Sequence, residues 1–107
     1  MSLAEACYVL TGKFPREEMF GLTSQIRRSA GSVAANIAEG HGRESTGSFI
    51  QQLRIAQGSL KELETHLLLA QRVGIAAADQ VEGRILQCEA VGKMLRSLIR
   101  ALQAKSD

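Results

Sequence analysis

Proline and aromatic residues are scarce in this sequence of 107 residues. Pro15 is the single proline, tryptophan is absent, and aromatic residues make up 4% of the chain. Because proline interrupts helices, its near absence permits long helices almost anywhere after residue 15. The core must then be built mainly from Leu, Ile, Val and Ala. The length fits one domain, residues 1–107.

Long apolar runs are also missing, and so is any segment that resembles a signal peptide. A transmembrane helix needs roughly 18 or more consecutive apolar residues, and a signal peptide begins with a basic segment followed by an apolar run. We therefore expect a cytoplasmic protein that does not contact a membrane. The net charge of +2 and the pI near 8.8 are only mildly basic, so the distribution of charge matters more than its total.

Cysteine occurs only twice, at Cys7 and Cys88, and both fall on apolar helical positions. We expect free thiols that pack as small hydrophobic groups, although a disulfide between them stays open as the alternative. The lone histidines, His41 and His66, have no second ligand at a metal-binding spacing. No metal and no cofactor are therefore expected.

The apolar spacing predicts two shorter helices in the first part of the chain. One covers residues 3–12 and ends before Pro15. The second covers residues 23–39, with Thr23 or Ser24 as its cap. Two glycines, Gly40 and Gly42, are expected to end it.

Two longer helices follow, over about residues 46–73 and 77–104. Ser45 or Thr46 is the expected cap of the first, and Gly74 its stop. Its apolar residues recur at alternating intervals of four and three, the pattern of helices packed side by side at a shallow angle; they are Phe49, Leu53, Ala56, Leu60, Leu63, Leu67 and Ala70. The last helix keeps this spacing and adds a second apolar line, Val91, Met94 and Leu98. That extra line faces either another subunit or the bundle interior. The predicted fold is an all-α, antiparallel up-and-down four-helix bundle with a short first helix.

Residues 22–74 contain, besides their helical periodicity, a set of short segments that can be compared with known families. The order and spacing of several short segments are specific; they are Gln25-Ile26-Arg27-Arg28, Asn36-Ile37-Ala38-Glu39-Gly40, Gly42-Arg43, Ser45, Phe49, Ala56, Gly58-Ser59 and Glu62-Leu63-Glu64-Thr65. This stretch resembles the bacterial four-helix-bundle family of 23S rRNA intervening-sequence proteins, whose relatives include accessory variability determinants of diversity-generating retroelements. The sequence departs from that family in its shorter first helix without tryptophan. It also has Ser48 where an acidic residue would complete a capping box.

The resemblance implies a ring-shaped homopentamer. It also implies a basic surface that, in some members, binds nucleic acid or a reverse transcriptase. The residues that we consider for contact with RNA or DNA are Arg27, Arg28, Arg43, Arg54, Lys61 and Arg72. Three of them, Arg54, Lys61 and Arg72, share the outer face of the third helix, where a line of cations suits phosphate. The alternative is an ordinary solvated face.

Arg27 and Arg28 have a structural alternative as well, an ion pair with Glu39 or with a glutamate of the third helix. The candidate structural or interface residues are Gly31, Ala34, Asn36, Ala38, Glu39 and Gly58. We expect Asn36 to bond to a neighbouring helix or to the turn after Gly40. Gly58 is expected to mark a close backbone approach, such as a subunit contact, and the alternative is a tolerated glycine on the surface. The basic end of the last helix, Lys93, Arg96, Arg100 and Lys105, either complements the helix dipole or meets an acidic partner.

No catalytic pattern is present, and we expect no enzyme. The leading hypothesis is a homo-oligomer that binds structured RNA, mainly through phosphates because aromatic residues for base stacking are few. The alternative is a scaffold that holds a protein partner such as a reverse transcriptase.

Overall fold

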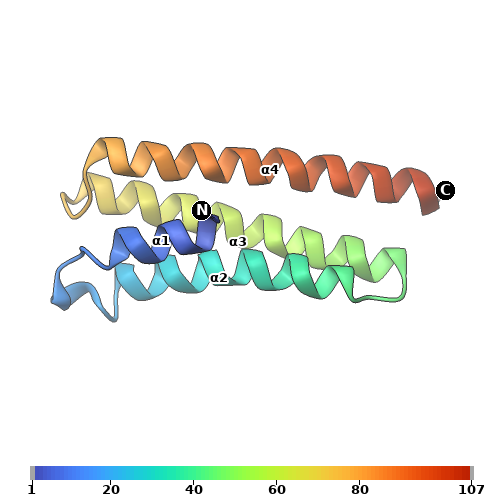
Figure 1. The fold of residues 1–107 in the computed structure, drawn as a ribbon, viewed down its shortest axis with the longest axis horizontal. Helices are drawn as coiled ribbons and strands as arrows, with labels where there is room; N and C mark the ends of the chain where they lie inside the picture. Colours follow the sequence, from blue (N-terminus) through green and yellow to red (C-terminus); the bar gives the residue numbers. More distant parts are fainter. Residues whose placement is uncertain (1, 107) are drawn as a thin grey trace.

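The computed structural model describes residues 2–106, which form an elongated helical bundle (Figure 1) measuring 48 × 22 × 21 Å. Successive helices run in alternating directions, as the colours of Figure 1 show. In chain order the elements are α1 (Leu3–Thr11), the 3-10 turn η1 (Arg16–Glu18), α2 (Leu22–His41), α3 (Thr46–Arg72) and α4 (Ala78–Ser106). The all-α, up-and-down bundle with a short first helix is therefore confirmed.

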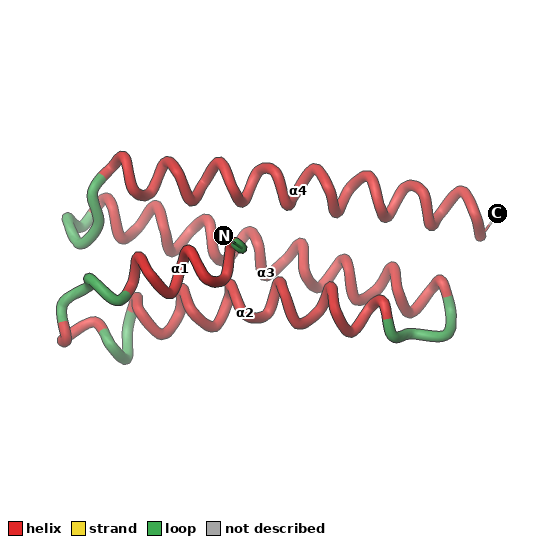
Figure 2. The backbone as a smooth tube through the Cα atoms, in the orientation of Figure 1, coloured by secondary structure: helices red, strands yellow, loops and turns green. Residues whose placement is uncertain are grey.

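The third helix is the centre of the packing. Its predicted apolar seam is buried from Leu53 to Ala70, with Leu53, Leu63 and Leu67 fully covered. α3 packs against both α2 and α4, whereas α1 lies against α2 and α4 on the other side. Figure 2 shows that α1 spans only part of the length of the bundle. In the part of the bundle that α1 does not reach, helices α2 and α4 are connected only through α3.

The ends of α1 and α3 are fixed by local hydrogen bonds. Ser2 and Glu5 form a reciprocal capping box at the start of α1, and these hydrogen bonds from Ser2 lower the pKa of Glu5. At α3 the Ser48 backbone N–H donates to Ser45 Oγ over 3.1 Å, so the predicted simple cap is confirmed. Gly74 follows α3 with φ of 78°, a conformation that favours glycine and ends the helix as predicted.

The predicted cap of α2 was wrong at the N-terminus, and at the C-terminus Gly42 was predicted correctly but Gly40 was not. The helix begins at Leu22, after Gly21, which offers no side chain as a cap. Glu18 supplies the missing acceptor, because its carboxylate receives the Leu22 backbone N–H over 3.4 Å.

At the other terminus α2 continues through Gly40 to His41, and only Gly42 caps it. Gly40 is buried, and a Cβ there would lie 2.8 Å from Cδ1 of Phe49. This glycine is needed for the close contact with α3 and not for ending the helix.

The second apolar line of α4 is only partly inside the bundle. Val91 and Leu98 are half-buried, and Met94 is 48% exposed. Together with Ala34 and Ile37 of α2, Val91 and Met94 line a shallow apolar groove that the first residues of α1 close at one end. The bundle interior therefore covers Val91 and Leu98 in part and leaves Met94 largely exposed.

Both cysteines are free and fully buried. Burial raises the pKa of Cys7 to about 11 and that of Cys88 to about 12, so both thiols stay protonated at neutral pH. Among the described helices, none combines the length and apolar character needed to cross a membrane.

Candidate nucleic-acid interface

The three cations predicted on the outer face of α3 are exposed to solvent. Arg54, Lys61 and Arg72 are all accessible, and the Lys61 side chain is 79% exposed. Its ammonium group lies 3.8 Å from a carboxylate oxygen of Glu64, one turn further along the helix. An exposed pair of this kind contributes little to stability, so Lys61 remains available to another anion.

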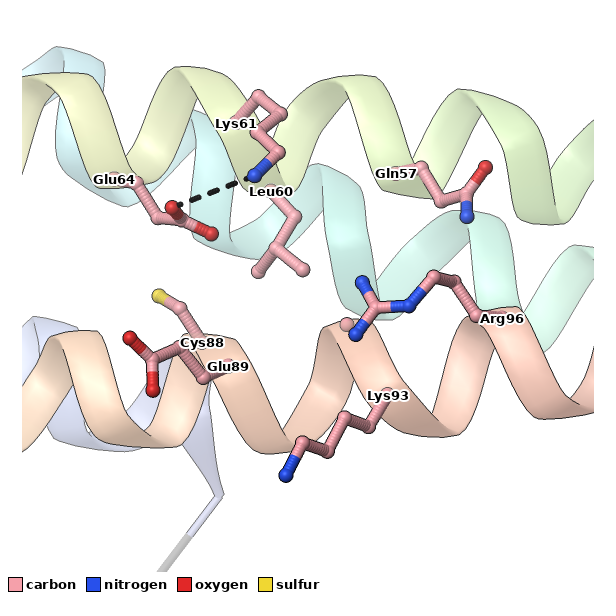
Figure 3. A pocket seen from close by; sticks show the side chains of 9 residues that line it. Gln57, Leu60, Lys61, Glu64, Cys88, Glu89, Lys93 and Arg96 are labelled. Carbon is pink, nitrogen blue, oxygen red and sulfur yellow. Dashed lines mark ion pairs between the residues drawn. The ribbon is translucent and has the colours of Figure 1, made fainter.

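Lys61 also lines an open groove between α3 and α4 (Figure 3). We call it the α3–α4 groove, and it has a volume of about 550 Å³. Its lining residues are Gln57, Leu60, Lys61, Glu64, Cys88, Glu89, Gly92, Lys93 and Arg96. The structure therefore brings a cation of the α3 line together with two cations of α4.

Gly92 makes room in the floor of this groove. A Cβ at that position would lie 3.4 Å from Nη1 of Arg96 and 3.5 Å from Cδ2 of Leu60. The Arg96 guanidinium extends from α4 towards α3, as Figure 3 shows.

Charge is divided along the groove. Figure 3 places Arg96 and Gln57 towards one end, and Glu64 and Glu89 towards the other. An anion would be attracted to the Arg96 end and repelled by the carboxylates.

From the sequence, Lys93 and Arg96 were predicted only to belong to the basic end of the last helix. The hairpin register alone does not pair them with Lys61, because Lys61 lies 13 residues before Gly74 whereas Lys93 and Arg96 lie 19 and 22 residues after it. The groove joins them along its length, a relation that only the structure shows.

Arg27 and Arg28 do not form the expected ion pairs with Glu39 or with an α3 glutamate. Arg27 Nε donates to Thr11 Oγ1 over 2.8 Å, and its guanidinium carbon lies 4.7 Å from the centre of the Tyr8 ring. Arg28 is exposed, and its Nη2 donates to Gln25 Oε1 over 3.0 Å. The hydrogen-bond partners of the two arginines, Thr11 of α1 and Gln25 of α2, are both neutral. These contacts therefore leave the positive charge of both arginines uncompensated. This correction reflects the position of α1, whose residues are closer to Arg27 than any glutamate of α3.

The other candidate residues lie apart from the α3–α4 groove. Arg43 and Glu39 are exposed near the end of α2 and the turn that follows. On the flank of α2, Ala34 and Ala38 are exposed, and no atom lies within 4 Å of a Cβ placed on Gly31. This flank is open to solvent in the monomer.

Gly58 is exposed too, and a Cβ there would meet nothing within 4 Å. The close backbone approach expected at Gly58 is therefore absent within the chain.

Asn36 bonds to its own helix and not to a neighbouring one. Its Nδ2 donates to the Ser32 carbonyl over 2.8 Å and to Ser32 Oγ over 3.1 Å. Ser32 Oγ in turn lies 2.7 Å from Ser59 Oγ of α3. The expected link between helices exists, but Ser32 makes it and Asn36 supports it.

The histidines are accounted for by packing. The rings of His41 and Phe49 lie 4.9 Å apart and tilted by 57°, and His66 is half-buried on α3. Across residues 2–106, no three His, Cys, Asp or Glu side chains gather at a position able to hold a metal ion.

Comparisons with known proteins agree with this architecture. A Bacteroides thetaiotaomicron protein of unknown function from the S23 ribosomal protein family, with a crystal structure at 1.70 Å resolution, is 26% identical. The match covers 91% of this chain and 97% of that chain, with a TM-score of 0.75. No curated protein sequence gives a significant match. The sequence pattern of the family described as 23S rRNA-intervening sequence protein matches residues 1–97. Since that match covers most of the sequence, the chain belongs to the family of 23S rRNA-intervening sequence proteins.

Proposed function

We propose that this protein is a non-enzymatic, homo-oligomeric binding protein that contacts structured RNA through its basic surface. The observation that supports the proposal best is the α3–α4 groove, which Lys61, Lys93 and Arg96 line together with Glu64 and Glu89. The Arg96 guanidinium points towards α3, whereas the Lys93 ammonium points away from it (Figure 3). Phosphate recognition needs several cations within reach of one backbone. The groove continues the line formed by Arg54 and Arg72 on α3, so a run of phosphates could follow that face.

Assembly would supply affinity that one chain lacks. With a net charge of +2, a single chain offers few contacts, whereas several copies repeat the same cations around one ligand. The uncovered part of the apolar groove, with Ala34, Ile37 and Met94, and the small residues beside it on α2 support self-association. Small side chains there permit a helix of a second copy to approach closely.

The test is RNA binding by fluorescence anisotropy with a hairpin of ribosomal RNA, at about 50 and about 200 mM salt. We expect an affinity that falls steeply with salt. A Lys61→Glu, Arg96→Glu variant should bind on the order of 100-fold more weakly, because hydrogen bonds to charged groups contribute about 1.5–3 kcal/mol each. The matched control is Lys13→Glu, Lys105→Glu, which makes the same change in net charge at the two ends of the molecule.

Light scattering on the same samples checks that both variants keep the oligomeric mass. Equal losses in the two variants would contradict a specific role for the groove. An absence of binding at low salt would overturn the proposal of RNA binding altogether.

The second candidate function is a scaffold for a protein partner, such as a reverse transcriptase. The apolar groove between α2 and α4 favours it, since apolar surface is more typical of protein contacts than of phosphate contacts. Loss of the oligomer on Met94→Glu would assign this groove to self-association. An unchanged oligomer without RNA binding would favour the scaffold.

A further inference from the structure

The corner where α1, η1 and the start of α2 meet exposes an unusual amount of aromatic surface. Phe20 is 93% exposed and Tyr8 is 52% exposed, and Met19 beside them is 52% exposed. Tyr8 and Phe20 are two of the four aromatic residues in the chain. Phenylalanine side chains stabilise a fold when they are buried. The exposure of Phe20 therefore requires an explanation.

These side chains border one shallow depression of about 370 Å³, which we call the α1–α2 corner. It is lined by Tyr8, Met19, Phe20, Thr23, Ser24, Arg27 and Arg28. A second depression adjoins it at Met19, Thr23 and Arg27 and adds Arg16 to its border. Aromatic rings, hydroxyl groups and three arginines therefore share one surface.

No carboxylate lines either depression. Glu18, the nearest half-buried acid, directs its carboxylate to the backbone N–H of Leu22. Glu17 and Glu18 belong to η1 at this corner but border neither depression, so no lining carboxylate offsets the arginines there, in contrast to the α3–α4 groove.

The arginines are also held in place before any ligand arrives. Arg27 is fixed between Thr11 and the Tyr8 ring, and Arg28 is bonded to Gln25. Because Thr11 and Gln25 are neutral, each guanidinium retains its charge and has donors left over. Little side-chain ordering would be required on binding.

We infer that the α1–α2 corner is a binding site for an unpaired nucleotide of the RNA. A base stacks on the exposed ring of Phe20, and Arg28 and Arg27 contact the adjoining phosphate. The hydroxyl groups of Thr23 and Ser24 line the same depression and can bond to base edges. Unpaired bases stacked on aromatic side chains are a general way in which proteins recognise loops and bulges in RNA. This inference rests on the proposed function and gives it a second, chemically different contact.

The experiment uses three RNA probes and the intact protein. The first is a hairpin with an unpaired loop, the second carries the same stem with an abasic loop, and the third is the blunt duplex of the stem. Phe20→Ala should weaken binding of the first probe about tenfold, because stacking on an aromatic ring strengthens binding of a base by roughly that factor or more. Binding of the other two probes should not change.

Phe20→Leu serves as the matched variant, since it keeps an apolar side chain but removes the ring. It should bind the unpaired loop as weakly as Phe20→Ala does.

Tyr8 is the single tyrosine and tryptophan is absent, so the intrinsic fluorescence of the chain reports on this corner. The looped hairpin should change the Tyr8 emission, and the abasic hairpin should change it much less.

The outcomes separate the two proposals. If no probe binds the unaltered protein, the proposed function fails. If all probes bind but Phe20→Ala affects none of them, or affects all equally, only the corner site is overturned. If Phe20→Ala lowers the oligomeric mass, the corner is an interface between protein chains and the inference is also overturned.

Discussion

The α3–α4 groove and the α1–α2 corner both contain several cations, but carboxylates line only the groove. In the groove, Glu64 and Glu89 lie among the cations, and Glu64 is 3.8 Å from Lys61. In the corner, Arg27 and Arg28 have neutral partners and aromatic neighbours. A count of cations alone would rank the two surfaces as similar. The neighbours of each cation show that the groove suits extended phosphate contact and the corner suits a nucleotide with an exposed base.

The largest effect is expected from removing the two carboxylates of the groove. In a Glu64→Gln, Glu89→Gln variant, repulsion of the phosphates disappears and Lys61 loses its ion pair. We expect about a tenfold gain in affinity for a blunt RNA duplex, equivalent to about 1.4 kcal/mol, measured by anisotropy at low salt.

Glu17→Gln, Glu62→Gln is the matched control, because both residues are exposed and neither lines the groove. A gain of equal size in the control would mean that only net charge matters.

The second comparison concerns the two arginines of the corner. Arg27→Lys keeps the charge but removes the planar group that packs over Tyr8 and bonds to Thr11, so unfolding in urea should require about 1 kcal/mol less free energy. Arg28→Lys alters an exposed contact with Gln25 alone and should change stability by a few tenths of a kcal/mol at most. Similar losses in the two variants would contradict the view that Arg27 is held by a half-buried contact between helices and Arg28 by an exposed contact within α2.

The last effect is expected at Cys88, which lines the groove, and it appears only at high pH. Its pKa is about 12 in the folded protein against 9.0 as the ordinary value, and burial is the main cause. The protonated thiol is therefore favoured by folding, and its contribution to stability is fully present below pH 9. As the pH rises above 9 the unfolded chain loses this proton first, and stability falls.

The free energy of unfolding of the unaltered protein, relative to Cys88→Ala, should be constant from pH 6 to about 8 and smaller by about 1 kcal/mol at pH 10. Urea titrations at these pH values give the measurement. A difference that stays constant up to pH 10 would show that the thiol is not sheltered from water.

The fold was predictable from the sequence because its strongest signal is local. The heptad spacing from Phe49 to Ala70 determines which face of α3 is buried, and Ser45 and Gly74 mark its ends. Gly40 misled the prediction of where α2 ends, because glycine serves both to end helices and to allow close packing. Which role applies at Gly40 depends on Phe49, a residue in another helix.

The candidate sites were less predictable, because both depend on neighbours from different elements. The outer line of α3 follows from helical periodicity alone, so Arg54, Lys61 and Arg72 were placed on the correct face. Arg96 joins Lys61 only through the pairing of two helices. Phe20 received no prediction of its own, since the sequence showed only that aromatic residues for base stacking are few. Its exposure of 93% depends on how the chain turns through η1.

The shortness of α1 has a consequence for local stability along the bundle. Where α1 is present, α4 is held from two sides, but its last turns contact α3 alone. Segments with fewer buried contacts open at lower free energy than the rest of a domain. The final turns of α4, with Arg100 and Lys105, should therefore fray and re-form while the remainder of the bundle stays folded.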